Sequence, residues 1–143
     1  MIRPMKEQDI PYIADINLQA FGKRNIEQLE AILKNNNYKY FVYVDGFIIK
    51  GFLGLLMVDG EVAEIITVCV DANYRHVGIG TKLMKYAEDC AVDMGYSKLA
   101  LEVKSSNMPA VKMYYKLKFV PISIRKKYYD GVEDAIVMHK NLK

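Results

Sequence analysis

The sequence contains only two cysteines, no long apolar run and little net charge, and each of these scarcities excludes a class of protein. Cys69 and Cys90 stand in no metal-binding spacing, so the sequence indicates neither a zinc site nor a disulfide framework, and we expect no metal. The longest apolar stretch, residues 47–58, covers twelve residues and contains Lys50, whereas a membrane-spanning helix needs about 20 apolar residues. We therefore expect no membrane association.

Net charge and composition further limit the classes of protein and of ligand that the sequence fits. Twenty Lys and Arg against seventeen Asp and Glu leave a net charge of +3, which is too small to suggest a nucleic-acid or anionic-membrane partner but is compatible with a small anionic ligand. Hydrophobic residues make up 52% and charged residues 26% of the 143 positions, a balance typical of a folded globular domain. Residues 1–6 lack the apolar run of a secretory signal, so a cytoplasmic protein is expected.

The order of patterns along the chain predicts a mixed α/β fold. No repeat or Pro/Gly/Ser-rich linker divides the chain, so we expect a single domain over residues 1–143. Helical spacing of apolar residues and runs rich in aromatic and β-branched residues alternate along it. The predicted helices cover residues 10–21, 26–33, 79–94 and a segment after Asn107, and the predicted strands cover residues 2–4, 38–44, 47–58, 61–70, 97–103, 120–128 and 132–139.

Connections between these elements indicate the sheet type. Asp-Gly pairs at 45–46, 59–60 and 130–131 are typical of two-residue hairpin turns. The helix 79–94 lies between two apolar strands, which predicts a right-handed crossover between parallel strands. The expected fold is a mostly antiparallel sheet of about seven strands with one parallel pair, flanked by about four helices.

The most informative local feature lies between strand 61–70 and helix 79–94. Gly78 and Gly80 let the backbone approach a ligand closely, and the free N–H groups of the first helical turn suit an anion such as a pyrophosphate. A tight strand-to-helix turn without a ligand is the alternative for the glycines alone. The candidate anion-binding residues are Arg75, His76, Val77, Gly78, Ile79, Gly80 and Thr81.

Two common phosphate-binding motifs do not fit this loop. Glu102 follows the glycines at about the spacing of a dinucleotide-binding fingerprint, but Leu83 occupies the place of the third glycine. The flanking elements are hairpins, whereas that fold needs repeated βαβ units. The Gly-Lys-Ser/Thr of a Walker loop is missing, so a different pyrophosphate-containing cofactor is expected.

These residues resemble the GNAT superfamily of acetyl-CoA-dependent N-acetyltransferases. The stretch from Val70 to Gly80 matches the superfamily's Arg/Gln-x-x-Gly-x-Gly/Ala turn after its fourth strand, and the predicted order of elements is also similar. The resemblance covers nearly the whole chain, is strongest over residues 64–138, and implies acetyl-CoA as the cofactor.

The downstream half resembles the ribosomal-protein-alanine N-acetyltransferases within that superfamily. Two positions depart from the usual pattern: Ala72 stands where Pro is common, and Lys118 stands where Gly usually follows the helix. The matching segments are residues 101–107, Ala110-x-x-x-Tyr114, Lys118-Phe119, Tyr128-Tyr129 and residues 133–138.

The resemblance also implies roles for individual residues. Glu102 is expected to accept the proton of the acceptor amine, directly or through water, and Tyr114 to protonate the sulfur of coenzyme A. Backbone N–H groups of Val68 or Val70 would polarise the carbonyl if their strand splays from its parallel partner. Asn107 is expected to cap its helix and to touch the pantetheine arm. A solvated Glu102 and a Tyr114 used for packing alone are the alternatives.

The expected acceptor is a primary amine, foremost the N-terminal α-amine of a protein such as a ribosomal protein. An α-amine has a pKa near 8 and is neutral at pH 7 far more often than a Lys amine. The acceptor groove is expected between helices 10–21 and 26–33 and the last hairpin, with solvated hairpin charges as the alternative. The hairpin residues concerned are Tyr128, Tyr129, Glu133 and Asp134.

Four other interpretations remain open at this stage. The chain could acetylate a small amine or an antibiotic with the same cofactor half, or sense acetyl-CoA without catalysis. A thiol acyl-enzyme at Cys69 is a further alternative, although alternation places Cys69 opposite Val68 and Val70 and favours a buried structural thiol. A nucleic-acid module is suggested only by the short basic run at 124–129 and is disfavoured.

Overall fold

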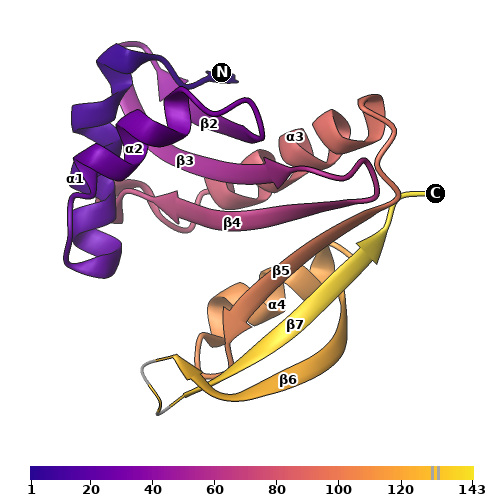
Figure 1. Ribbon diagram of the computed structural model, residues 1–143. Coiled ribbons are helices and arrows are strands. Elements are labelled where there is room, and N and C mark those ends of the chain that lie inside the picture. Colours follow the sequence, from indigo (N-terminus) through magenta and orange to yellow (C-terminus); the bar gives the residue numbers. More distant parts are fainter. Residues whose placement is uncertain (130, 132) are drawn as a thin grey trace.

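Seven strands and four α-helices make up the described part of the computed structural model, which covers residues 1–129 (backbone alone at 129), 131 and 133–143. The predicted turn at Asp130-Gly131 and the predicted strand start at Val132 lie partly outside these residues. Figure 1 shows the arrangement. The elements are β1 (Ile2–Pro4), α1 (Ile10–Phe21), α2 (Ile26–Leu33), β2 (Tyr38–Asp45), β3 (Ile48–Met57), β4 (Val62–Val70), α3 (Ile79–Asp93), β5 (Lys98–Lys104), α4 (Met108–Lys116), β6 (Val120–Tyr129) and β7 (Glu133–Asn141), with short 3-10 turns at Glu7–Asp9 and Ala72–Tyr74.

The strands form one mixed sheet in the order β1-β2-β3-β4-β5-β7-β6. Among the described residues, β4 and β5 are the one parallel pair, and every other neighbouring pair is antiparallel. The predicted fold class is therefore confirmed, including the crossover helix α3 between the two parallel strands.

Helices cover the two faces of this sheet and create two core layers. α1 and α2 lie on one face, where Ile13, Val42 and Phe52 belong to one buried cluster. α3 and α4 lie on the opposite face, where Leu83 and Leu99 belong to a larger buried cluster. Cys69 is buried in the α1–α2 layer, whereas Val68 and Val70 pack toward the α3–α4 layer, as strand alternation predicts.

The first hairpin turn differs from the prediction by one residue. β2 and β3 pair as far as Asp45 and Ile48, so the two loop residues are Gly46 and Phe47 rather than Asp45 and Gly46. Gly46 takes a φ of 62°, a left-handed conformation that costs Gly least. The prediction of a hairpin turn at Gly46 is therefore confirmed, but Gly46 is the first loop residue and not the second as predicted.

The second turn is longer than predicted. β3 ends at Met57 and β4 begins at Val62, which leaves four connecting residues. The Asp59 carboxylate accepts hydrogen bonds from the backbone N–H groups of Glu61 (2.8 Å) and Val62 (3.1 Å). This side-chain turn competes with a two-residue hairpin and sets the longer connection.

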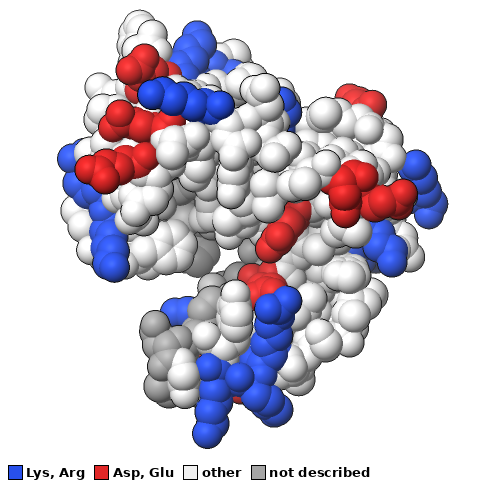
Figure 2. Space-filling view, in the orientation of Figure 1, with Lys and Arg blue, Asp and Glu red and all other residues white. Residues whose placement is uncertain are grey.

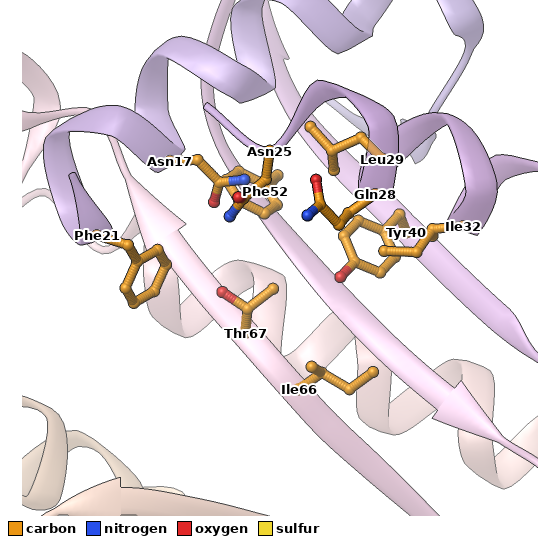
Figure 3. Close-up of a pocket in the computed structure, with 10 residues that line it drawn as sticks. All are labelled: Asn17, Phe21, Asn25, Gln28, Leu29, Ile32, Tyr40, Phe52, Ile66 and Thr67. Carbon is orange, nitrogen blue, oxygen red and sulfur yellow. The ribbon is translucent and has the colours of Figure 1, made fainter. Parts of the chain in front are cut away.

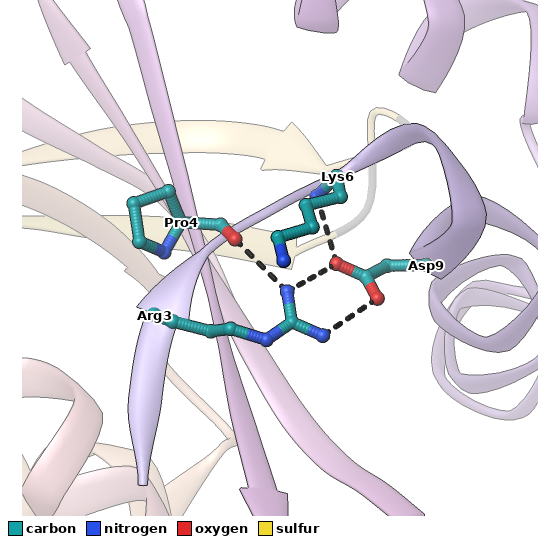
Figure 4. Close-up of polar contacts among 4 residues, drawn as sticks. All are labelled: Arg3, Pro4, Lys6 and Asp9. Atoms are coloured by element: carbon teal, nitrogen blue, oxygen red, sulfur yellow. Dashed lines mark hydrogen bonds and ion pairs between the residues drawn. The ribbon is translucent and has the colours of Figure 1, made fainter. Parts of the chain in front are cut away.

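A buried ion pair fastens the N-terminal strand to the start of α1. Asp9 is 5% exposed and accepts hydrogen bonds from Arg3 Nη1 (2.7 Å), Arg3 Nη2 (2.9 Å) and the Lys6 backbone N–H (2.7 Å). Arg3 Nη1 also donates to the Pro4 carbonyl (Figure 4). Burial opposes ionisation of Asp9, but Arg3 and the Lys6 N–H outweigh it and hold the pKa of this carboxyl below its usual range.

Replacing Asp9 by Asn should destabilise the fold most at neutral pH. Loss of the charge weakens the bonds to Arg3 and Lys6, and we expect the free energy of unfolding to fall by about 1–3 kcal/mol. A lowered folded-state pKa stabilises the fold above the unfolded-state value of about 3.9, and this contribution is lost as the pH falls through the folded-state value. Urea unfolding from pH 7 to about 3 should therefore show a shrinking difference between wild type and variant.

Asp15 offers the matched control for this experiment. Its side chain is exposed and pairs with Arg24 at 3.0 Å, so Asp15→Asn should change the free energy of unfolding by less than about 0.5 kcal/mol. An Asp9→Asn deficit that stays constant across the pH range would contradict the assignment.

Candidate active site

The parallel strands separate part-way along their length. β4 and β5 pair through four register positions, from Val62 with Lys98 to Ile65 with Leu101. Beyond them β4 continues beside β3 to Val70, and β5 continues beside β7 to Lys104. Figure 1 shows the two halves of the sheet diverging from this point. The splay that catalysis was expected to require is therefore present.

A β-bulge marks the start of the separation. The register between β3 and β4 passes from Gly54 opposite Thr67 to Leu55 opposite Ile65, which leaves Ile66 as the extra residue. A bulge bends its strand and locally increases the twist. Ile66 directly follows the last position at which β4 pairs with β5, so the bulge turns β4 away from its parallel partner.

Backbone amides of β4 point into the opening. The Asp71 N–H donates to the Lys50 carbonyl on the β3 side (2.8 Å). Successive amides along a strand point to opposite sides, so the N–H groups of Val70 and Val68 point away from β3. The Val70 carbonyl on this edge accepts a hydrogen bond from Arg75 Nε (3.2 Å), which ties the following loop to the opening.

The loop after β4 presents the N-terminus of α3 at the same end. Gly78 is the N-cap residue with a φ of 87°, a left-handed conformation that favours Gly. The Lys82 N–H donates to the Gly78 carbonyl (3.1 Å), so the amides of Ile79, Gly80 and Thr81 precede the first α-helical bond and are available to an anion. A Cβ at Gly80 would lie 3.4 Å from Met113 Sδ on α4.

The remaining predicted loop residues are exposed around these amides. Arg75, His76 and Val77 all lie at the surface, and His76 adopts a left-handed φ of 67°. Because the site combines donor amides, the Arg75 guanidinium and the two glycines Gly78 and Gly80, the residues present fit a pyrophosphate group.

Glu102 lies where the two strands part. It follows Leu101, the last residue of β5 that pairs with β4. Leu101 and Val103 point into the α3–α4 core layer, so Glu102 faces the side of the sheet that carries α1 and α2. Its side chain is 19% exposed, and Oε1 lies 3.1 Å from Arg125 Nε. A half-buried carboxylate at the mouth of the opening can exchange protons with a ligand there.

Tyr114 and Asn107 lie on the other side of the sheet with α4. Tyr114 is buried and packs against Phe119 with ring centroids 6.0 Å apart. The Asn107 side chain accepts a hydrogen bond from the Ala110 N–H (3.4 Å), so its predicted role as N-cap is confirmed. Lys118 after this helix has a φ of 73°, the left-handed conformation that Gly would adopt more cheaply.

The acidic residues of the last hairpin are engaged within the chain. Glu133 accepts hydrogen bonds from the Ser106 hydroxyl and from the Ser106 N–H (3.0 Å), which hold the pKa of its carboxyl below the usual range. Asp134 accepts from the Lys127 N–H (2.9 Å) and Lys126 Nζ (3.3 Å), which lower the pKa of that carboxyl. These carboxylates shape the loops beside the opening, a role that the sequence did not indicate.

A pocket of about 240 Å³ opens beside the bulge on the α1–α2 side. Among its described lining residues none carries a charge, and Asn17, Tyr40 and Thr67 supply polar groups. Burial raises the pKa of Tyr40 to about 12, so this phenol stays protonated. Figure 3 shows all the lining residues: Asn17, Phe21, Asn25, Gln28, Leu29, Ile32, Tyr40, Phe52, Ile66 and Thr67.

The pocket and Glu102 share one face of the sheet, whereas the α3 N-terminus and Tyr114 belong to the other. Thr67 lines the pocket on the face of Cys69, which is also the face of Glu102. Figure 2 shows a groove between the half of the molecule with α1 and α2 and the half with β6 and β7. Lys and Arg side chains gather on the half with β6 and β7. Two reactants can therefore meet in the opening from opposite faces.

The family follows from comparison with known proteins. The family model described as the acetyltransferase (GNAT) family matches residues 10–119. The chain belongs to this family. It is therefore an acyltransferase, and the GNAT superfamily that the sequence resembles is confirmed.

Individual relatives of this GNAT enzyme are similar over most of their length. A Bacillus subtilis (strain 168) protein provisionally named ribosomal protein bS18-alanine N-acetyltransferase is 30% identical over 141 residues, covering 96% of this chain and 92% of the relative. The crystal structure of the ribosomal-protein-S18-alanine N-acetyltransferase from Escherichia coli superimposes with a TM-score of 0.90 at 28% identity, covering 100% of this chain and 94% of that one. An aminoglycoside 6'-N-acetyltransferase complexed with coenzyme A shares the fold alone, at 16% identity, a TM-score of 0.87, and coverage of 100% and 97%.

The sequence predicted a groove beside α1 and α2 in this acetyltransferase, but neither the residues that line the pocket nor the partner of Glu102. Asn17 carried a signal, because it continues the buried helical series of Ile10, Ile13 and Ala14 although it is polar. Arg125 carried none, since two strands bring it to Glu102 from 23 positions away. The Cys69 thiol does not support an acyl-enzyme, because burial raises its pKa and keeps it protonated.

Within the described ranges, no group of three His, Cys, Asp or Glu side chains is placed to hold a metal ion. None of the helices in this part of the chain combines the length and apolar character needed to span a membrane.

Proposed function

We propose that this GNAT enzyme acetylates the N-terminal α-amine of a cytoplasmic protein, most specifically a ribosomal protein, with acetyl-CoA as donor. The observation that carries the proposal is the opening between β4 and β5, which has the α3 N-terminus at its end and Glu102 at its start. When bound, acetyl-CoA supplies a thioester-activated acetyl group. The names of the relatives from Bacillus subtilis and Escherichia coli support a ribosomal protein as the acceptor.

Residues on the two faces of the sheet would bind the cofactor and act on the acceptor amine. The amides of Ile79, Gly80 and Thr81 would hold the pyrophosphate, with Arg75 and His76 beside them. The N–H groups of Val68 and Val70 would donate to the carbonyl oxygen as it gains charge. Glu102 would accept the proton of the amine from the α1–α2 face.

Tyr114 and Asn107 would act from the α4 side. Tyr114 would donate a proton to the departing thiolate, and Asn107 would contact the pantetheine arm while capping α4. The amine would lose its proton to Glu102 on one face of the sheet, and the sulfur would gain one from Tyr114 on the other. Solvent would then take up the proton of Glu102 and reprotonate Tyr114, so that the reaction balances over one turnover.

Pocket chemistry favours a peptide over a polycationic small molecule. A polyamine or an aminoglycoside carries several ammonium groups that need carboxylate partners. The described pocket residues offer no charge, and Glu133 and Asp134 are already hydrogen-bonded within the chain. An uncharged pocket instead suits a neutral side chain near the N-terminus of a peptide.

Acetyl transfer to a matched set of amines tests this proposal. Peptides with the N-terminal sequences of ribosomal proteins would be compared with the same peptides bearing a blocked α-amine and one free Lys, and with polyamines and aminoglycosides. At pH 7 we expect kcat/KM to favour the free α-amine by about 10²-fold, because a Lys amine is far more often protonated. Preference for a polyamine or an aminoglycoside would overturn the acceptor assignment, and coenzyme A binding without transfer to any amine would indicate a sensor.

A further inference from the structure

We propose that Arg125 is a positioning residue that holds the Glu102 carboxylate in the orientation needed to receive the proton of the acceptor. The inference rests on the proposed role of Glu102 but concerns a residue on a different strand. Arg125 Nε lies 3.1 Å from Glu102 Oε1. The contact therefore ties one of the two carboxylate oxygens of Glu102 to β6.

The sheet register places Arg125 for this contact. Glu102 pairs with Val137 of β7, and Arg125 pairs with Ala135 two positions along the same strand. Positions two apart share a face, so the Arg125 side chain reaches diagonally across β7 to Glu102. Ala135 is fully buried yet belongs to neither core cluster, which is consistent with the long Arg125 side chain covering it.

A second contact holds the guanidinium from another direction. Its carbon lies 5.3 Å from the centre of the Tyr128 ring, a distance at which cation and ring attract each other. The side chain is 56% exposed, and an exposed Arg with one partner retains much rotamer freedom. Contact with both a carboxylate and a ring restricts that freedom and therefore restricts Glu102.

The backbone of β6 is shaped to make both contacts possible. The pairing of β6 with β7 shifts register between Arg125 and Tyr129, and Lys127 inside this irregularity has a left-handed φ of 51°. The Asp134 carboxylate accepts the Lys127 N–H at 2.9 Å and so fastens the bulge. Bulges next to active sites commonly re-aim a side chain, and this one follows directly after Arg125.

Arg125 can orient Glu102 without joining the proton transfer. A guanidinium stays protonated at every physiological pH, so Arg125 neither takes the amine's proton nor returns it. By holding Oε1 it would fix the orientation of the whole carboxylate, which would then receive the proton in a defined direction. Without Arg125 the carboxylate can rotate away from the opening between β4 and β5.

A double-mutant cycle with Glu102 tests this assignment. Arg125→Gln should lower kcat by about tenfold and leave the KM for acetyl-CoA unchanged. A loss of this size is at the lower end of what is observed when a residue that orients a metal-binding side chain is removed. In a Glu102→Gln background the same change should have less than a twofold effect, because no carboxylate remains to orient. Arg125→Lys should recover part of kcat, since Lys keeps the charge but lacks the planar guanidinium. Lys85→Gln, which removes the same charge from an exposed position on α3, is the control and should leave kcat unchanged.

A crystal structure of Arg125→Gln provides a readout that needs no acceptor. We expect the Glu102 carboxylate in a single orientation in the wild type and in more than one orientation in the variant. An equal loss of kcat in both Glu102 backgrounds, or a Glu102 that keeps its orientation in the variant, would overturn the assignment. Failure of the wild type to acetylate any peptide would instead count against the proposed function and would leave the structural comparison decisive for Arg125.

Discussion

Replacing Glu102 by Gln is expected to lower kcat for peptide acetylation at pH 7 by about 10²- to 10⁴-fold, the usual contribution of a positioned general base. Gln has nearly the same shape as Glu but cannot take up the proton of the amine. Glu102 is the first residue of β5 beyond the pairing with β4, so β4 no longer lies beside it and that side of the strand is open. The measurement is the rate of thiol release with saturating acetyl-CoA and an α-amine peptide.

The pH dependence separates loss of a base from loss of structure. An α-amine has a pKa of about 7.7–8.0, so the fraction that arrives already neutral rises between pH 7 and 9. The deficit of Glu102→Gln should therefore shrink over this range, whereas a structural defect would persist. Glu64→Gln is the control, because Glu64 is exposed on the paired part of β4 and its removal should leave kcat unchanged. Wild-type activity in Glu102→Gln would refute the assignment of the base.

Local and periodic features of the chain were predictable from the sequence. Asn107 could be predicted as an N-cap because Asn is among the residues that satisfy this position best, and Pro109 stands in the first turn of the helix that follows. Cys69 was placed on the face opposite Val68 and Val70 by alternation alone. Such features depend on residues within a few positions of one another, so a short stretch of sequence is enough to predict them.

Features that depend on distant strands were not predictable in the same way. The splay of β4 from β5 was recognised as a requirement, but the bulge at Ile66 that accompanies it could not be located from β4, which has no Gly or Pro there. The glycine next to the bulge, Gly54, lies on the partner strand β3. The contact between Arg125 and Glu102 depends on the register of β5, β7 and β6 together. A shift of one residue in either pairing would place the two side chains on opposite faces.

The pocket on the α1–α2 side shows the same limit. Its lining combines residues of α1, α2, β2, β3 and β4, and Gly54 of β3 makes room for it. A Cβ at Gly54 would overlap the Tyr40 ring, so Tyr40 occupies the space that any larger residue would take. In the sequence, Gly54 is one glycine inside an apolar strand, and its partner is identified only once β2 and β3 are in register.

Replacing Tyr114 by Phe is expected to lower kcat by about 10²-fold or more while the protein remains folded. The ring is buried against Phe119, and Phe preserves this packing because only the hydroxyl is removed. Without the phenol, the thiolate of coenzyme A must leave without a positioned proton donor. The KM for acetyl-CoA should change little, since the amides of the α3 N-terminus, which would hold the pyrophosphate, are untouched.

Tyr115→Phe separates the proposed acid from the general effect of losing a tyrosine on α4. Tyr115 is adjacent in sequence but exposed, because neighbouring residues on a helix point about 100° apart. Its hydroxyl should be dispensable, with kcat within about twofold of wild type, as for an ordinary surface position. The pH–rate profiles provide the decisive comparison: an enzyme that uses a phenol as acid loses activity at high pH when that proton is lost, and this descending limb should be absent from Tyr114→Phe. If Tyr114→Phe keeps both the wild-type rate and the descending limb, water or another group protonates the sulfur, and Tyr114 serves the core alone.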